Sequence, residues 1–253
     1  MQVVHVDGLR DADEHAYRRL IKGMDAFEKY HALAPAASLR YRLYPRLPGV
    51  KADGTTLTIQ GYKVKLPVAL GSDLTFALPR DAQALDDNAQ VSTNRKSRSF
   101  AWHPEVRSPG LPANARRLGD LRLECEIDRA AKLFVGLRLP TYYVVDAAVD
   151  ICTTLPGGVW IYYADRAVFS VTLVHGNRRE ALFSRLMYGN PAKWIQTFYD
   201  FYPVLTDRTY MLRIADTSWP DDTLVELDYM DDAAVADASA TQAMQTSQPS
   251  GTP

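Results

Sequence analysis

The stretch that decides the fold runs from Thr55 to Leu78 and reads TTLTIQGYKVKLPVALGSDLTFAL. Apolar side chains alternate with polar ones through three short segments, at Leu57, Ile59, Tyr62, Val64, Leu66, Val68, Leu74, Phe76 and Leu78. A period of two places one set of side chains on the core face of a sheet and the other set toward water. The stretch therefore predicts a half-buried antiparallel meander whose apolar set forms the core of a scaffold.

Further strands are predicted on both sides of this stretch. Leu39, Tyr41 and Leu43 alternate with outward basic residues, and short strands are expected at Val91 and at 100–102, around a polar turn at 94–97. Residues 121–127 give the clearest alternation, with apolar odd positions and charged even ones, which points Cys125 into the core. Four more segments have a strand pattern: 158–164, 169–174, 210–214 and 223–229, the second with an apolar face of Phe169, Val171 and Leu173.

Helical periodicity is confined to two places. Residues 9–31 predict an amphipathic helix that ends before Pro35, because apolar residues recur at three- and four-residue steps at Tyr17, Leu20, Ile21, Met24 and Phe27. Asp11, Asp13 and Glu14 are expected in its first turns, where acids complement the helix dipole. A short second helix is predicted around Trp194, Phe198 and 201–202.

Length and composition are those of a globular protein, and the strand patterns above place it in the mainly β class. The chain has 253 residues, 47% of them apolar, and a formal net charge of −1, which gives no reason to expect nucleic acid as a partner. No apolar run reaches the ~18–20 residues of a membrane span. We expect antiparallel β-sandwich-like modules with an N-terminal amphipathic helix: a helical segment at 1–35, a sandwich-like domain at 36–130, a second β-rich domain at 131–230 and a disordered tail at 231–253.

The two cysteines, Cys125 and Cys152, allow two interpretations. A disulfide between them would contribute about 3 to 4 kcal/mol in the chain-entropy model, and would favour an exported protein. The alternative is a pair of buried thiols in a reducing compartment. Neither cysteine belongs to a zinc or redox motif.

The first residues, MQVVHVD, lack the basic and apolar regions of a signal peptide. Our interpretation is that Met1 replaces a signal sequence that has been removed, so we expect a periplasmic or secreted protein.

Two resemblances point the same way. The segment from Thr55 to Arg80, above all KLPV at 65–68 and FALPR at 76–80, resembles transthyretin-like or carboxypeptidase-regulatory-like sandwich modules over roughly a tenth of the chain. RSPGLP at 107–112 followed by RRLGDL at 116–121 resembles a family of uncharacterised exported proteins of Gram-negative bacteria. This second resemblance implies a cell-envelope location and no catalytic residue.

Motifs for catalysis or metal binding are absent from the sequence. The five histidines, at 5, 15, 31, 103 and 175, form no metal-ligand motif, and only His15, one turn from Asp11 on the predicted helix, suggests a weak site. Ser108 and Ser170 lack a nucleophile elbow. The acidic pairs at 86–87, 221–222 and 231–232 are adjacent in sequence, whereas a glycosidase pair converges from different elements. We expect no cofactor, no metal and no catalytic residue.

The stretch from Asn94 to Arg117 is the candidate contact surface. It is predicted as a loop region rich in Arg and Lys, opposed only by Glu105. The candidate ligand-binding residues are Arg95, Lys96, Arg98, Trp102, Arg107, Arg116 and Arg117, because guanidinium groups beside aromatic rings suit phosphate or carboxylate recognition. An envelope protein, a lipid headgroup or an acidic glycan would be the partner. The alternative is a solvated hairpin that protects a sheet edge.

A second cluster is aromatic: Trp160, Tyr162, Tyr163, Trp194, Phe198, Tyr199, Phe201 and Tyr202. Exposed, these rings would bind sugars or a protein, but the spacing of Trp194, Phe198 and Phe201 favours core packing. A strong scaffold pattern without a catalytic motif favours a non-catalytic binding or structural protein of the cell envelope. The alternative is a hydrolase that acts on an envelope polymer through carboxylates from separate loops.

Overall fold

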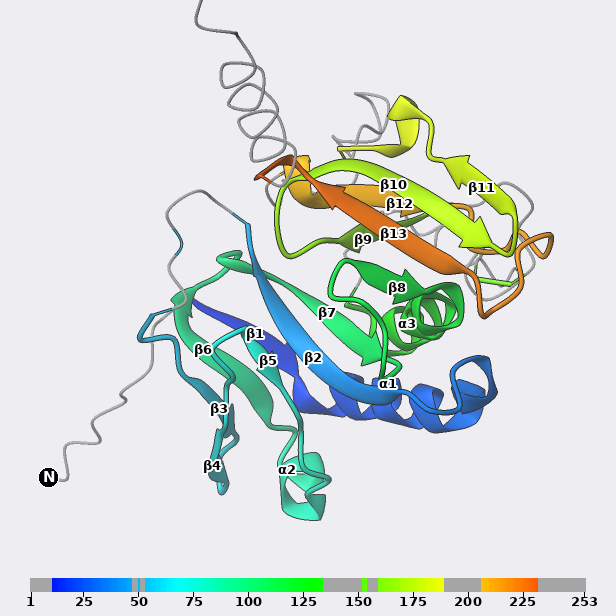
Figure 1. The fold of residues 1–253 in the computed structure, drawn as a ribbon. Coiled ribbons are helices and arrows are strands. Elements are labelled where there is room, and N and C mark those ends of the chain that lie inside the picture. The colour runs from blue at the N-terminus through cyan, green and yellow to red at the C-terminus, as the bar shows by residue number, and fades with distance from the viewer. Residues whose placement is uncertain are drawn as a thin grey trace, which may run out of the picture.

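The protein is mainly β, with several antiparallel sheets and an N-terminal helix, as predicted (Figure 1). The structure is a computed structural model that describes residues 11–46, 50, 53–133, 152–153, 159–188 and 206–231. The second predicted helix and residues 232–253 of the predicted tail lie outside these ranges. Among the described residues, none of the helices is long and apolar enough to cross a membrane.

The first half of the chain forms two sheets. One runs in spatial order β1 (Ala12–Ala16), β6 (Gln90–Lys96), β3 (Leu57–Gln60) and β4 (Lys65–Val68). The other runs β5 (Thr75–Phe76), β2 (Ser38–Pro45) and β7 (Phe100–Arg107), and the short helix α2 (Ala82–Asp86) connects β5 to β6.

The stretch from Thr55 to Leu78 divides between these two sheets. β3 and β4 form the expected antiparallel hairpin, whereas β5 leaves it and pairs with β2, so the prediction of a single meander is wrong. The apolar set is buried as expected, except that Leu66 is half-buried and Tyr62 is 94% exposed. Tyr62 lies in the β3–β4 turn, where the alternation of the strands no longer holds.

The N-terminal helix begins later than predicted. Residues 12–16 form strand β1, helix α1 runs over Tyr17–Tyr30, and the 3₁₀ helix η1 covers His31–Leu33. The apolar stripe of α1 packs into the core as expected. Asp13 is not a first-turn acid; its buried carboxylate accepts hydrogen bonds from Phe100 N and from Trp102 Nε1. Partners on β7 thus hold residues 12–16 in a strand.

The second half forms a four-stranded sheet and a strand pair. The sheet runs β11 (Arg178–Ala181), β10 (Val168–His175), β13 (Leu224–Tyr229) and β8 (Ala115–Arg117), and β12 (Thr209–Leu212) pairs with β9 (Trp160–Tyr163). Two 3₁₀ helices, η2 (Ser184–Leu186) and η3 (Thr206–Arg208), lie between β11 and β12. All four strands predicted in this half are confirmed.

The predicted apolar face of β10 needs one correction. Val171 and Leu173 are buried, but Phe169 is 62% exposed and Val168 takes the buried place. The register of β10 with β13 shifts between Val168 and Ser170. This bulge turns the Phe169 side chain to the exposed face of the sheet.

Residues 121–127 are not a strand, because the segment Leu118–Ala131 forms helix α3. Apolar and charged residues alternate in 121–127 because three stripes of the helix surface are buried, each against a different partner. Residues within one stripe are four positions apart. Leu123, Ile127 and Ala131 enter the core of the first half; Leu121 and Cys125 enter that of the second half. The third stripe carries carboxylates at 120, 124 and 128 that are also buried.

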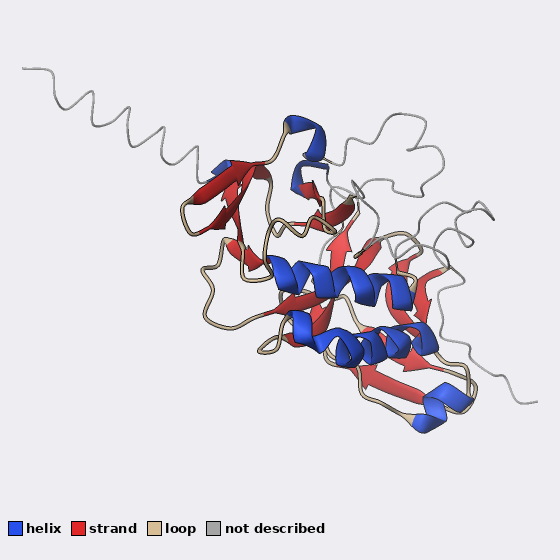
Figure 2. Ribbon diagram, turned by 90° about the vertical axis from the view of Figure 1, so that its right-hand side faces the viewer, coloured by secondary structure: helices blue, strands red, loops and turns tan. Residues whose placement is uncertain are grey.

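Helix α3 lies between the two cores and holds them together (Figures 1 and 2). It packs side by side with α1, and at their contact a Cβ on Gly23 would come within 2.5 Å of the Tyr41 hydroxyl and 3.1 Å of the Ala131 side chain. Cys125 forms a disulfide with Cys152, the first of the two interpretations of these cysteines. Because α3 belongs to both cores, the division into two separate domains stays a prediction.

Candidate functional site

The candidate contact surface from Asn94 to Arg117 is mostly strand. It comprises the end of β6, all of β7 and β8, so the prediction of a loop region is wrong. Arg116 is 3% exposed and forms an ion pair with Glu124. Trp102 is equally buried, with its indole N–H bonded to Asp13. These two candidates lie inside the molecule, where a ligand at the surface does not reach them.

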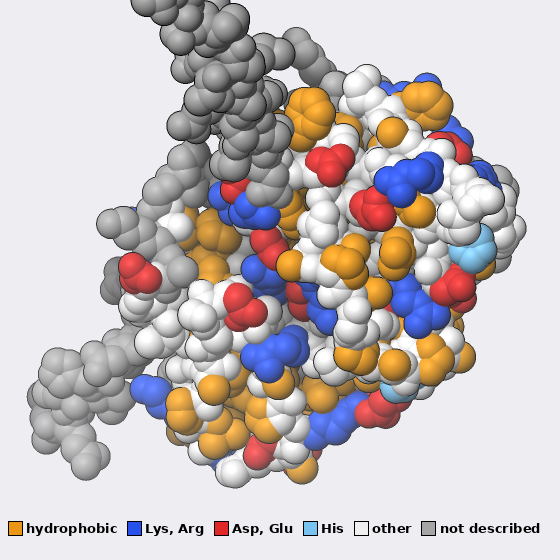
Figure 3. Space-filling view, viewed as in Figure 1, with side chains coloured by type: hydrophobic (Ala, Val, Ile, Leu, Met, Phe, Trp, Pro, Cys, Tyr) orange, Lys and Arg blue, Asp and Glu red, His pale blue; other side chains and the backbone are white. Residues whose placement is uncertain are grey.

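The other five candidate residues are dispersed. Arg107 donates to Glu105. Arg117 belongs to β8 and lies opposite Leu224 of the neighbouring strand β13. Arg95 donates to the hydroxyl of Thr55 and to a backbone carbonyl in the turn before β3, while Lys96 and Arg98 lie at the β6–β7 turn. The structure brings only Arg107 and Arg116 together, around Glu105. On the face shown in Figure 3, Lys and Arg side chains are interspersed with Asp and Glu.

Carboxylates from α3 and β1 line the edge of β7 that has no neighbouring strand. This strand pairs with β2 on one side only, so the N–H groups of its even-numbered residues point away from the sheet. Asp13 accepts from Phe100 N at 2.7 Å, Glu124 from Val106 N at 2.7 Å, and Asp120 from Ser108 N at 2.8 Å. Pro104, between them, has no N–H to satisfy. Side-chain oxygens thus replace the neighbouring strand that the edge lacks.

Arg116 completes this arrangement at Val106. Its guanidinium donates to Val106 O at 2.9 Å while it pairs with Glu124, so the ion pair serves both the donor and the acceptor of one edge residue. Burial raises the pKa of Glu124, against the lowering effect of Arg116. The pair is enclosed, so its chemistry is structural. Sequence reasoning missed it, although acids at four-residue steps on 120, 124 and 128 were a usable signal for a helix face.

His103 is one of two histidines in the described residues whose pKa is strongly shifted, the other being His15. Its Nδ1 lies 2.9 Å from Pro104 O, and its Nε2 lies 2.9 Å from a carboxylate oxygen of Asp128, which also accepts from the Trp160 indole. Burial disfavours the charge, but Asp128 more than compensates and raises the pKa of His103 to about 9. His103 is therefore a buried imidazolium, held by Pro104 O at Nδ1 and by the charge of Asp128 beside Nε2.

Glu105 is the anion at the centre of the Arg cluster on the same strand. Burial would raise its pKa, but the positive charges of Arg116, Arg107 and Arg42 lower it to about 2. Tyr44 donates to its second oxygen at 3.1 Å. With every partner supplied by the protein, the cluster holds β2, β7 and β8 together.

The remaining candidates from the sequence have structural partners. His15 lies in β1 against the Trp102 ring, and burial lowers its pKa to about 4; within the described ranges, no three His, Cys, Asp or Glu side chains are grouped to hold a metal. Ser108 donates to Asp120, and Ser170 to Asp228.

The acidic pairs also act locally. Asp87 accepts from the amides of Lys63 and Val64 in the β3–β4 turn, and Asp221 pairs with Arg122 of α3.

The aromatic cluster divides in the same way. Trp160 and Tyr162 are buried in the second core, and Tyr163 packs near Tyr44. Trp194, Phe198, Tyr199, Phe201 and Tyr202 lie outside the described residues.

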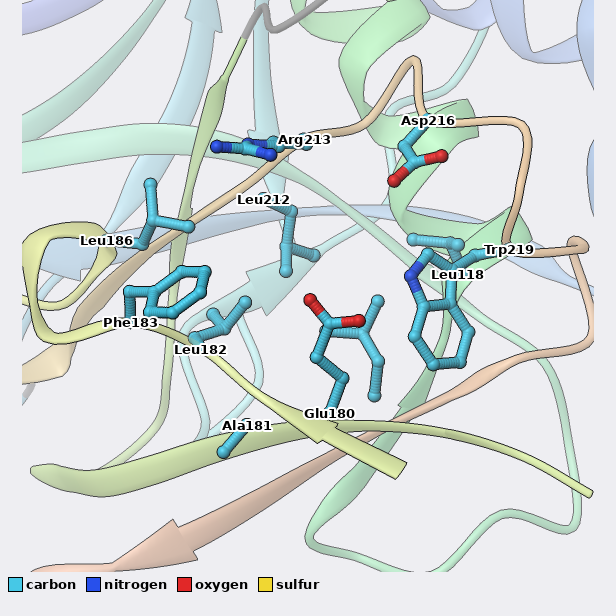
Figure 4. Close-up of a pocket in the computed structure, with 11 residues that line it drawn as sticks. Leu118, Glu180, Ala181, Leu182, Phe183, Leu186, Leu212, Arg213, Asp216 and Trp219 are labelled. Atoms are coloured by element: carbon cyan, nitrogen blue, oxygen red, sulfur yellow. The ribbon is translucent and has the colours of Figure 1, made fainter. Parts of the chain in front are cut away.

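A hollow in the second half is the better candidate for a binding site (Figure 4). Its enclosed volume is about 50 Å³, or about 510 Å³ when the open solvent at its mouth is counted. The residues around it come from α3, β10, β11, η2, β12 and the segment after β12: Leu118, Leu173, Glu180, Ala181, Leu182, Phe183, Leu186, Leu212, Arg213, Asp216 and Trp219. The lining is therefore mainly aliphatic and aromatic, as is typical of ligand sites. No local pattern in the sequence indicates this hollow, because its leucines belong to separate segments of the chain.

Charged groups stand around the mouth of this hollow. Glu180 extends from β11 between the leucines, and Arg213 and Asp216 stand on the segment that follows β12 (Figure 4). Hydrogen bonds from Ser218 lower the pKa of Asp216, so this carboxylate is ionised at neutral pH. Arg178 lies over the Trp219 ring, 3.6 Å from its centroid, and fixes one wall.

Comparison with known proteins does not assign the chain to a family. No protein-family model, curated protein or solved structure matches the chain.

Proposed function

We propose that this protein is a non-catalytic binding protein of the cell envelope, which takes an apolar group of its ligand into the hollow beside β11. The convergence of five leucines carries the proposal; they come from α3, β10, the segment after β11, η2 and β12: Leu118, Leu173, Leu182, Leu186 and Leu212. Burying four methylene groups there contributes roughly 3 kcal/mol, enough to matter for affinity. The mouth is polar, so a ligand with one apolar group and a polar remainder fits.

Two features support an envelope location. The Cys125–Cys152 disulfide is typical of proteins that mature in an oxidising compartment. The resemblance of residues 107–112 and 116–121 to exported proteins agrees with it. Of the three expected partners, an envelope protein suits the hollow best. A lipid headgroup and an acidic glycan are polar and would not bury an apolar group against the leucine lining.

The test uses N-phenyl-1-naphthylamine, a neutral apolar dye whose fluorescence rises in apolar sites. We expect saturable binding to the native protein and at least tenfold weaker binding to Leu182→Arg, which places a charged side chain at the half-buried edge of the hollow. Phe169→Ala is the matched control, because Phe169 is an exposed aromatic residue of the same sheet and does not line the hollow. Failure of the native protein to bind the dye, or equal binding by Leu182→Arg, would contradict the proposal.

A hydrolase is the second candidate, and one observation favours it. Glu180 and Asp216 reach the same hollow from separate segments, as two acting carboxylates would. Against it, the lowered pKa of Asp216 makes this residue a poor general acid. Glu180→Gln and Asp216→Asn separate the two proposals: a hydrolase loses turnover of peptidoglycan fragments in both variants, whereas a binding protein shows no turnover at all and retains the dye.

A further inference from the structure

Strand β11 is an edge strand, and no described strand lies on its outer side. It pairs only with β10 among the described strands, and all four of its residues are exposed. Leu182 N donates to Val171 O at 2.8 Å, and the register between β10 and β11 then assigns the inward bonds of β11 to its even-numbered residues. The N–H and C=O groups of Arg179 and Ala181 therefore point outward, away from β10.

Three other edge strands, β7, β5 and β4, have side chains or a proline that limit pairing on their outer side. Carboxylates occupy the edge of β7, as described above. At β5, the guanidinium of Arg40 bonds the hydroxyl and the carbonyl oxygen of Thr75. The outer strand β4 contains Pro67, which has no N–H to offer on the outer side of the sheet. The outward backbone of β11 keeps both its donors and its acceptors, and no described strand pairs with them, so it is a site where a partner strand can add.

The hollow lies on the inner face beside this edge. Glu180 is opposite Leu173, which faces the core, so Glu180 and Leu182 share the inner face and both line the hollow. A strand added to β11 would place alternate side chains on that same face. One of them would extend toward the hollow, beside Leu182 and Leu186. Backbone pairing with a pocket for alternate side chains is an established way to recognise an extended peptide.

We propose that β11 accepts an extended segment of a partner protein as an added antiparallel strand, with one aliphatic or aromatic side chain of that segment in the hollow. The inference rests on the proposed function, since it uses the same hollow, and it names the class of ligand. An extended backbone is the chemistry that matches the outward donors and acceptors at Arg179 and Ala181. A second copy of this chain fits less well, because a two-fold axis centred at Glu180 sets two like charges opposite each other.

The probe is a capped seven-residue peptide of threonines with one central leucine and a lysine at each end. In an antiparallel addition, the leucine side chain faces the hollow, whereas the amides of the two flanking residues face β11. We expect binding that weakens at least tenfold when those two flanking amides are N-methylated. Methylation of the leucine amide, which points away from β11, is the matched control and leaves binding within threefold. Replacement of the leucine by alanine also weakens binding.

Hydrogen exchange locates the bound peptide. The outward amides of Arg179 and Ala181 should exchange at least tenfold more slowly in the complex, while those of Arg178 and Glu180, already bonded to β10, change little. Arg179→Pro and Ala181→Pro each remove one outward N–H and should abolish peptide binding. Because Arg179 does not line the hollow, Arg179→Pro should preserve dye binding.

The outcomes distinguish the two proposals. Dye binding without peptide binding overturns strand addition and leaves the binding function intact, whereas loss of both overturns both. Equal affinity for the unmodified and the flank-methylated peptide also overturns strand addition, since side-chain insertion alone would then explain binding. Sedimentation of the protein as a dimer that Ala181→Pro converts to a monomer would replace the partner peptide by a second copy of the chain.

Discussion

Strands β7 and β11 both end a sheet, yet the protein treats their edges in opposite ways. At β7, three carboxylates and a guanidinium bond outward backbone groups of Phe100, Val106 and the following Ser108, and these charged side chains are buried. At β11, the outward groups of Arg179 and Ala181 point away from β10 beside an apolar hollow, and no described strand pairs with them. The difference shows that buried charge in this molecule is a means of closing an edge, and that perturbed titration alone does not mark its functional site. The open edge is the better place to look for a partner.

The largest expected effect is at the closed edge. Glu124→Leu leaves the Arg116 charge buried without its counterion and Val106 N without an acceptor, so we expect a loss of about 3–5 kcal/mol in the free energy of unfolding, measured in urea. Glu124→Gln keeps an acceptor for the amide and should cost less. A loss below ~1 kcal/mol for Glu124→Leu would show that the edge does not depend on this pair.

The His103–Asp128 pair predicts how the stability of the closed edge depends on pH. The folded-state pKa of His103, about 9, lies above its ordinary value of 6.5. The stabilisation is therefore complete below about pH 6.5 and is lost as the pH rises through 9. We expect unfolding free energy to fall by about 1–3 kcal/mol between these two pH values. His103→Gln should reduce the change of unfolding free energy with pH. If this change stays the same in the variant, groups other than His103 cause the pH dependence.

Asp120 tests the end of the same edge. Asp120→Ala leaves Ser108 N and the Ser108 hydroxyl without their acceptor, so the expected loss is about 1–3 kcal/mol. Asp120→Asn, which still offers an oxygen, serves as the control. If alanine and asparagine cost the same, the carboxylate does not act through this hydrogen bond. Thermal unfolding of the three proteins at one pH provides the measurement.

The smallest effect is expected at the open edge. Ala181→Pro removes an N–H that points to solvent, so stability should change by less than about 1 kcal/mol. The neighbouring Glu180→Pro removes an inward bond to β10 and leaves its acceptor unpaired, so it should cost about 1–3 kcal/mol. Comparable losses for the two variants would show that the outward direction of the Ala181 amide is wrong, and the contrast between the edges would disappear.

Several elements could be predicted from local pattern because their partners impose a regular period. The apolar stripe of α1 and the alternation in β2, β3 and β4 each face a single core, so the pattern in the sequence matches one buried face. The four strands of the second half follow the same rule, apart from Phe169, where a bulge shifts the register. Local pattern failed for α3, because three of its faces are buried against different partners.

The candidate sites were harder to predict for a related reason. A run of Arg residues in sequence does not say whether acids from elsewhere meet them. Arg116 meets Glu124 across a strand–helix junction, and this contact turns a predicted ligand residue into a buried structural one. The hollow combines leucines from positions as distant as 118 and 212, with no local spacing to reveal it.

The sequence by itself determined the mainly β class, the N-terminal helix and the strands that face one core, because period and turn residues are local properties. Tertiary structure decided that 118–131 is a helix, that β5 leaves the β3–β4 hairpin, and which charges are buried. Those outcomes depend on partners far along the chain, whose hydrogen bonds and counterions outweigh local preference. The closed edge of β7 and the open edge of β11 are of this second kind.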